Sequence, residues 1–371
     1  MNESPSATKK EPIGDWKHPV VVSRTNFVHK SLSCWAVNSA VGCGHGCRFC
    51  YVPAASTVKI GGALKAHGVE DPDAEWGSYA LLRPWDERKF LSSLRAAEKI
   101  PAHELNRDGN RAIMFCTSTD PYQVFRHADP ARGRELTEQG LAHIARALEL
   151  IRDTSTLRVR IMTRSPLAAL HFDLFRTFGS RLLFGMSIPT LQHGLARVYE
   201  PHAPAPSARL STLKKAHNAG IPVYLAMAPT YPECDYADML ATLTAVRPFQ
   251  PATVFHEPIN IRVENVARIA AHAKRIGHEV KLDVFQTPAA WRQYALESLH
   301  TAEKASAAAG LAERLHSWPD SALGAKAVVS AMPDPAAYRA WLDRAWHRVS
   351  EWPGEEQSPT VARGARPPQP R

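Results

Sequence analysis

The 371-residue sequence predicts an α/β protein, a partial or complete (β/α) barrel with a helical C-terminal extension. Two observations indicate this fold class. Short apolar runs alternate with longer segments in which apolar residues recur every three or four positions, as in parallel sheets with crossover helices. Polar residues also follow the ends of several apolar runs, where the active sites of such folds lie. The alternation repeats about seven times, which favours a barrel over an open sheet.

The predicted strands are β-branched or nearly continuous in apolar residues, as strands buried on both faces should be. The first strand, near residues 34–38, precedes a glycine-rich loop. Six more strands are expected at residues 112–116, 159–163, 182–188, 223–229, 253–258 and 280–285.

The segments between the strands carry helix signals. Residues 135–153 place leucine, isoleucine and alanine at three- and four-residue spacing. Ser165 and Pro166 suit the cap and the first position of the next helix. Two further helical segments end at Gly220 and Gly277, where a glycine favours a helix stop.

Four regions are expected along the chain. A polar tail covers residues 1–18, and the barrel core covers residues 19–287. A helical extension packed on the barrel follows at residues 288–352. Residues 353–371 are rich in proline and arginine, and both tails are expected to be disordered.

Composition narrows the class of protein. A net charge of +9 is compatible with nucleic acid as a partner, and equally with an ordinary solvated surface. Six cysteines in this length do not make a disulfide scaffold. The N-terminus lacks the apolar core of a signal peptide, and no run of about 18 apolar residues is present. We therefore expect a cytoplasmic protein with no membrane partner.

Three of the six cysteines lie in one short loop, "GCGHGCRFC", with the spacing C-x3-C-x2-C. They are Cys43, Cys47 and Cys50, and the glycines between them allow the backbone to fold tightly. Thiolates are preferred ligands of zinc and of iron–sulfur clusters. A zinc site needs four ligands, and His45 could supply the fourth. A [4Fe–4S] cluster held by three cysteines would instead leave one iron open for a ligand.

The spacing, with Phe49 just before the last cysteine, resembles the signature of the radical S-adenosylmethionine (radical SAM) enzymes. The resemblance implies a [4Fe–4S] cluster on Cys43, Cys47 and Cys50, with S-adenosylmethionine chelating the fourth iron. It also implies reductive cleavage of that cofactor to a 5′-deoxyadenosyl radical, which abstracts hydrogen from a substrate. A reductant such as flavodoxin or ferredoxin is then an expected partner, and the fold is a (β/α) barrel of radical SAM type.

Further segments resemble the spore photoproduct lyase-like branch of this superfamily, over about residues 34–260. They include "CTSTDPYQ", "TRSP", "SIPT" and "AGIPVYLAMAPTYP". The resemblance implies a set of cofactor-binding residues at strand ends: Phe49, Ser118, Asp120, Arg164, Ser165, Ser187 and Pro229. For two of them a purely structural role is the alternative, because Ser165 is a good helix cap and Asp120 is a good turn residue.

Two residues are candidates for radical transfer in this branch. Cys116 resembles a cysteine that returns a hydrogen atom to the product, although a small buried residue at a strand end is the alternative. Tyr51 matches one of two relay tyrosines, whereas the other position holds Phe49, which has no O–H hydrogen. The substrate therefore stays open between a nucleic-acid lesion and a small metabolite or protein. The rival class is a non-catalytic zinc- or iron–sulfur-binding module.

Overall fold

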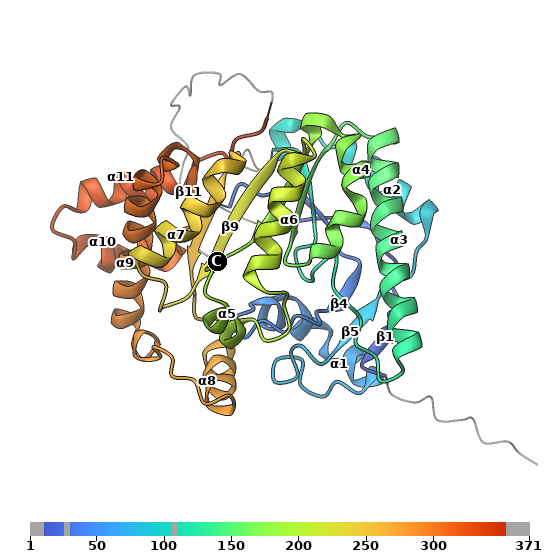
Figure 1. Cartoon of the computed structure of the whole chain (residues 1–371), viewed down its shortest axis with the longest axis horizontal. Helices are drawn as coiled ribbons and strands as arrows, with labels where there is room; N and C mark the ends of the chain where they lie inside the picture. Colours follow the sequence, from blue (N-terminus) through green and yellow to red (C-terminus); the bar gives the residue numbers. More distant parts are fainter. Residues whose placement is uncertain (1–10, 26–29, 106–109, 354–371) are drawn as a thin grey trace, which may run out of the picture.

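The computed structural model describes residues 11–25, 30–105 and 110–353. Its main sheet contains eight strands in the order β11-β10-β9-β8-β7-β6-β3-β2 (Figure 1). The strands are β2 (Val22–Arg24), β3 (Trp35–Val37), β6 (Ala112–Phe115), β7 (Arg158–Thr163), β8 (Leu182–Ser187), β9 (Val223–Thr230), β10 (Val254–Pro258) and β11 (Leu315–Ser317). All neighbours pair in parallel except β2, which pairs antiparallel with β3.

The sheet is open. Its edge strands, β2 and β11, do not pair with each other within the described residues. The prediction of a mostly parallel α/β fold is confirmed, and of the two barrel alternatives the structure excludes the hydrogen-bonded complete barrel for this part of the chain.

Helices follow most strands and cover the outer face of the sheet, as Figure 1 shows for α3, α6 and α7. Aspartate or threonine caps several of them at the N-terminus: Asp129, for example, accepts a hydrogen bond from the amide of Ala131. The helices of the core are α2 (Glu87–Glu98), α3 (Pro130–Thr154), α4 (Phe172–Arg176), α5 (His193–Tyr199), α6 (Pro206–Asn218), α7 (Tyr236–Val246) and α8 (Asn265–Arg275).

A second sheet of three strands lies beside the cysteine loop. Its order is β1 (Ile13–Asp15), β5 (Ala80–Leu82) and β4 (Ala40–Gly42), and the short helix α1 (Gly61–Leu64) lies between β4 and β5 in the chain. Residues 13–15 are therefore ordered as a strand, which corrects the prediction of disorder for this part of residues 1–18. Residues 1–10 and 354–371, which make up most of the two predicted tails, lie outside the described residues.

The C-terminal region is only partly helical. It contains α9 (Pro288–Ala308), α10 (Lys326–Ser330) and α11 (Pro335–Trp346), but also β11, which pairs in parallel with β10. The prediction of a helical extension is thus not confirmed as such, because this region also supplies the eighth strand of the main sheet. The boundary expected at residues 287–288 stays a prediction.

The strand predicted at residues 280–285 is wrong. Residues Asp283–Phe285 form a 3-10 turn that packs against α9. The charged side chains of Lys281 and Asp283 alternate with the apolar ones, and among residues 280–285 only Phe285 is buried. The segment therefore lacks the apolar faces that a central strand needs.

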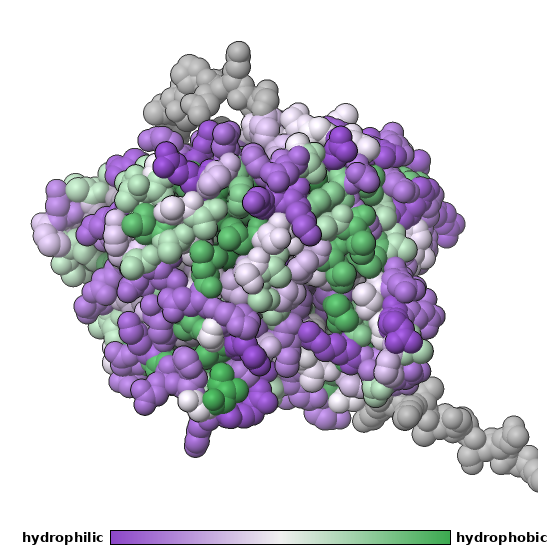
Figure 2. Space-filling view, in the orientation of Figure 1, coloured by the Kyte–Doolittle hydropathy of each residue, from purple (hydrophilic) through white to green (hydrophobic). Residues whose placement is uncertain are grey.

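Most of the apolar core lies between the sheet and its helices, and hydrophilic side chains cover much of the face in Figure 2. Among the described helices, none combines the length and the hydropathy that a bilayer crossing requires.

Candidate functional site

The cysteine loop begins at the end of β4, and two glycines shape it. Gly42 has a φ of +84°, and a Cβ there would lie 2.3 Å from the carbonyl oxygen of Tyr79. Gly46 has a φ of +57°, and a Cβ there would lie 3.0 Å from the Cα of Gly77. Both positions need a residue without a side chain, because left-handed backbone and close approach occur together.

Side chains from distant segments hold the backbone of the loop. The amide of Gly44 donates to Oε1 of Gln123 at 2.7 Å, and its carbonyl accepts from Nη1 of Arg126 at 2.6 Å. Arg268, on α8, donates to the carbonyls of Arg48 at 3.2 Å and Cys50 at 2.5 Å. The loop is therefore fixed from two sides before any ligand binds.

The three thiols line one pocket, which we call the cysteine pocket. Burial is the main cause and a neighbouring thiol a smaller one of the rise in the pKa of each thiol to about 12. The thiolate forms therefore need a cation, as a bound metal centre provides. The residues that share this pocket with Cys43, Cys47 and Cys50 include seven of the predicted site residues: Phe49, Tyr51, Cys116, Ser118, Asp120, Arg164 and Pro229.

The thiol set fits a cluster better than a single ion. Among the described residues, no three histidine, cysteine, aspartate or glutamate side chains meet closely enough to share one metal ion. A [4Fe–4S] cluster offers each thiolate a different iron, so its ligands need not converge on one point. His45, the fourth ligand of the zinc alternative, has its Nδ1 3.4 Å from Oδ2 of Asp120 instead.

Asp120 joins three segments around the pocket. Oδ1 accepts from Thr163 Oγ1 at 2.6 Å and from the amide of Tyr122 at 2.9 Å, and Oδ2 accepts from the amide of Arg164 at 2.8 Å. Burial by itself raises the pKa of this carboxyl, but the contact with His45 and these hydrogen bonds lower it to about 2. The carboxylate is thus ionised, and it positions the ends of β6 and β7 around the cysteine loop.

Arg164 is part of a buried charge group. Its Nε donates to Oε1 of Glu200 at 2.6 Å, and Glu200 also pairs with the buried Arg209. The guanidinium lies 5.6 Å from the ring centroid of Phe49, and Arg164 lines the cysteine pocket together with the three thiols. Burial opposes ionisation of Glu200, but the two arginines lower the pKa of this carboxyl below its ordinary value.

Two predicted residues lie outside the pocket. Ser165 accepts a hydrogen bond from the amide of Leu167 at 3.3 Å, which is the helix-cap alternative considered from the sequence. Ser187 is fully buried at the end of β8, and its carbonyl accepts from Arg209 at 3.0 Å. Neither side chain lines the cysteine pocket.

The two candidates for radical transfer face the same pocket. The hydroxyl of Tyr51 donates to the carbonyl of Thr117, the residue after Cys116, at 2.8 Å. Cys116 is buried, its Sγ lies 3.9 Å from Ser39 Oγ, and burial raises the pKa of its thiol to about 12. A protonated thiol of this kind carries the S–H hydrogen that a donor needs.

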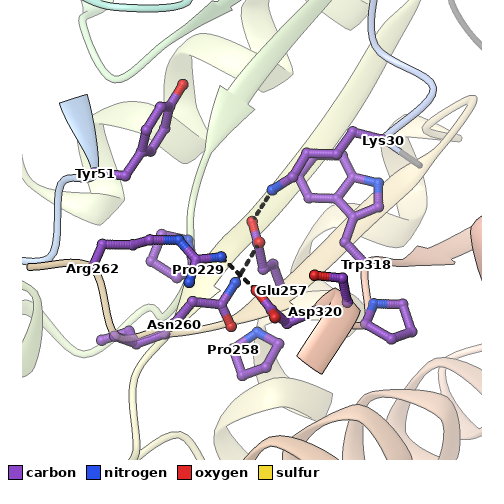
Figure 3. A pocket seen from close by; sticks show the side chains of 12 residues that line it. Lys30, Tyr51, Pro229, Glu257, Pro258, Asn260, Arg262, Trp318 and Asp320 are labelled. Atoms are coloured by element: carbon purple, nitrogen blue, oxygen red, sulfur yellow. Dashed lines mark hydrogen bonds and ion pairs between the residues drawn. The ribbon is translucent and has the colours of Figure 1, made fainter. Parts of the chain in front are cut away.

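A second cavity of about 380 Å³, the outer chamber, adjoins the cysteine pocket (Figure 3). Lys30, Tyr51, Pro229, Glu257 and Trp318 line both cavities, so the two are continuous. The remaining wall includes Asn260, Arg262 and Asp320, which Figure 3 places around Glu257 and Pro258.

The polar side chains of the outer chamber are tied to one another. Lys30 Nζ lies 2.5 Å from Glu257 Oε2 and 4.5 Å from the ring centroid of Trp318. Asn260 Nδ2 donates to Glu257 Oε1 at 2.8 Å, and Arg262 pairs with Asp320. No sequence pattern singled out Lys30 or Arg262. Trp318 is only 4% exposed, yet it lines both cavities.

Comparisons with known proteins give relatives and a shared fold. No protein-family model matches the chain. An uncharacterized protein of Acidianus two-tailed virus is 30% identical over 200 residues, which cover 53% of this chain and 56% of the viral protein. An uncharacterized protein of Methanocaldococcus jannaschii is 22% identical over 270 residues, which cover 73% of this chain and 86% of that protein.

Solved structures of spore photoproduct lyase superpose on most of the chain. One variant gives a TM-score of 0.57 at 13% identity, covering 82% of this chain and 80% of the lyase. A variant with bound AdoMet and dinucleoside spore photoproduct gives a TM-score of 0.53 at 15% identity, covering 77% of this chain and 76% of the lyase. The likeness predicted from the motifs is thus confirmed at the level of the fold: the chain has the fold of the spore photoproduct lyases.

Proposed function

We propose that the chain is a radical SAM enzyme that binds a [4Fe–4S] cluster through Cys43, Cys47 and Cys50. One observation carries the proposal. The three thiols of the C-x3-C-x2-C motif line a single pocket with polar residues from the ends of β6 and β7, in a fold shared with spore photoproduct lyase. In parallel α/β folds, ligands bind at this end of the strands.

The residues of the pocket have distinct tasks in this proposal. The cysteines hold the cluster, and the loop backbone is already fixed by Arg126 and Arg268. S-adenosylmethionine occupies the rest of the cysteine pocket, with Ser118 and Arg164 on its wall and Pro229 toward the outer chamber. When bound and reduced, the cluster supplies the electron that cleaves S-adenosylmethionine to a 5′-deoxyadenosyl radical.

The outer chamber is the proposed substrate site, because it opens directly onto the cofactor pocket. A nucleic-acid lesion is the substrate class that the available observations favour: the net charge is +9, and a lyase of this fold was solved with a dinucleoside photoproduct. Cys116 is the proposed hydrogen donor to the product. Phe49 in place of a second tyrosine means that any hydrogen relay differs from that of the lyases.

Anaerobic reconstitution with iron and sulfide tests the proposal. We expect about four irons per chain and, with dithionite and S-adenosylmethionine, formation of 5′-deoxyadenosine. Cys43→Ala should lose both the cluster and the cleavage. Cys234→Ala is the matched control, because Cys234 is also buried but lies outside the cysteine pocket.

Cys116→Ala separates the hydrogen donor from the cluster ligands. Its iron content and its cleavage of S-adenosylmethionine without substrate should both match the wild type. A colourless protein that binds one zinc ion and cleaves no S-adenosylmethionine would refute the proposed function.

A further inference from the structure

A group of five basic side chains lies on the outside of the cysteine loop, and we call it the cationic patch. It comprises Arg48, Arg126, Arg197, His202 and Arg275. They come from the cysteine loop, the loop after β6, α5, the loop after α5, and the end of α8. Helices α5 and α8 pack against each other, and Figure 1 shows both at the lower edge of the molecule.

The patch is exposed and lacks acidic partners. Arg126, Arg197, His202 and Arg275 are exposed, and Arg48 is half-buried. Within the described ranges, none of the four arginines forms an ion pair with an aspartate or glutamate. Elsewhere in the described residues several arginines do form such a pair, for example Arg146 with Glu87.

The basic groups are close enough to affect one another. Burial, followed by the charges of Arg126 and Arg48, lowers the pKa of the His202 imidazole. Nδ1 of His272, which is buried, accepts a hydrogen bond from Arg275 Nη2 at 2.8 Å. Like charges held together in this way repel, and an acidic partner would relieve that repulsion.

The patch is bonded directly to the segment that carries the cluster ligands. Arg126 donates to the carbonyl of Gly44 at 2.6 Å and to that of His202 at 2.9 Å. Arg48 follows Cys47 directly, and its amide donates to the carbonyl of Tyr199 at 2.8 Å. None of the five residues lines the cysteine pocket or the outer chamber. The patch residues therefore lie outside both cavities, although two of them contact the cysteine loop itself.

We propose that the cationic patch is the docking surface for a small acidic electron-transfer protein that reduces the cluster through the cysteine loop. This inference rests on the proposed function. In the step, the reduced donor loses one electron and the cluster gains it; no bond forms or breaks, and no proton moves. Because an electron donor needs only to approach the cluster, it can dock on a surface outside the substrate cavity.

Nucleic acid fits this surface less well. A substrate strand has to reach the outer chamber, so its phosphates would be bound by basic groups around that opening. None of the five patch residues lines that opening, so phosphates bound at the patch would not place a strand in the outer chamber.

The test uses Arg197→Glu/Arg275→Glu, which leaves the loop contacts of Arg48 and Arg126 in place. The control is Lys304→Glu/Lys326→Glu, on α9 and α10, which changes the net charge equally. The donor is a reduced acidic flavodoxin. Calorimetry on the cluster-free chain should show flavodoxin binding roughly tenfold weaker for the patch variant than for the wild type or the control.

With the reconstituted enzyme, the flavodoxin-driven rate of 5′-deoxyadenosine formation should fall roughly tenfold in the patch variant, mainly through a higher KM for flavodoxin. The dithionite-driven rate should match the wild type, because dithionite needs no docking surface. Equal flavodoxin binding and equal flavodoxin-driven rates in all three proteins would overturn the docking site and leave the proposed function standing. Loss of DNA binding in the patch variant with unchanged flavodoxin binding would also overturn it.

The two proposals fail in different ways. If the wild type binds flavodoxin through the patch but cleaves no S-adenosylmethionine even with dithionite, the proposed function is refuted, and with it the electron transfer assigned to the patch.

Discussion

Gly42→Ala is the sharpest test of how the cysteine loop is built. Gly42 ends β4, pairs with Ala80 of β5, and precedes the first cysteine directly. Its φ of +84° lies in the left-handed region, and the added methyl group would lie 2.3 Å from the backbone oxygen of Tyr79 and 2.5 Å from its ring. The backbone oxygen cannot rotate away, so the strand or the loop has to move.

Two effects set the expected decrease in the free energy of unfolding. A left-handed conformation costs an alanine about 1 kcal/mol more than a glycine. Forcing a methyl group into a packed site costs about 1–3 kcal/mol more. We therefore expect the free energy of unfolding to fall by about 3 kcal/mol, with the displacement concentrated at Cys43.

The assay combines urea unfolding, followed by circular dichroism, with iron analysis after anaerobic reconstitution. Gly42→Ala should unfold at lower urea and bind less than half of the wild-type iron, in the same range as Cys43→Ala. Gly62→Ala is the matched control, because Gly62 lies in α1 with nothing within 4 Å of the added Cβ. It should keep its iron and unfold at the same or slightly higher urea.

The reasoning is refuted if Gly42→Ala has the iron content and the unfolding midpoint of Gly62→Ala. That result would mean that the loop reaches its cluster-binding conformation without the left-handed residue.

Two further predictions concern buried charge. Glu200→Gln leaves Arg164 and Arg209 without their carboxylate, so the free energy of unfolding should fall by about 3–5 kcal/mol in urea titrations; a loss below about 1 kcal/mol would contradict this. Burial lowers the pKa of His256 and of His316 to about 3, so both stay neutral in the folded protein. Because the unfolded chain takes up these protons below about pH 6.5, stability should decline from there toward pH 3, by about 2 kcal/mol per histidine at pH 5. Urea titrations at pH 7.5 and pH 5 measure the decline, which His316→Phe should reduce.

Strands with a long apolar run could be predicted from the sequence to within a residue or two. The run at 159–163 corresponds to β7, and the run at 182–188 corresponds to β8. Strand β11 has only the residues Leu315–Ser317, with a histidine at its centre, so its sequence carries no strand signal. It forms a strand because it pairs in parallel with β10, and that partner is distant in the sequence.

The same distinction applies to the site. That the three cysteines share one site could be predicted because all three lie in one local segment with a specific spacing. The hydrogen bond from Arg268 to the carbonyl of Cys50 joins residues that are 218 positions apart in the sequence. The hydrogen bond from Lys30 to Glu257 joins residues that are 227 positions apart. Contacts of this kind depend on the finished topology and leave no local pattern. Ser165 shows that a local pattern can also be ambiguous. A serine at this position is typical both of a helix cap and of a cofactor ligand, so the sequence alone does not separate the two roles.

The position of Trp318 in both cavities has a consequence for the order of events during synthesis. Trp318 follows Cys50 by 268 residues. The ribosome therefore completes the cysteine loop long before it adds Trp318, which lines the pocket. At about 5–20 residues per second, the interval is roughly 13–54 seconds. Assembly factors that act during translation therefore meet thiols not yet enclosed by the C-terminal segment. Once β11 has joined the sheet, Trp318 and Lys30, which lie 4.5 Å apart from ring centroid to Nζ, complete the wall that the two cavities share.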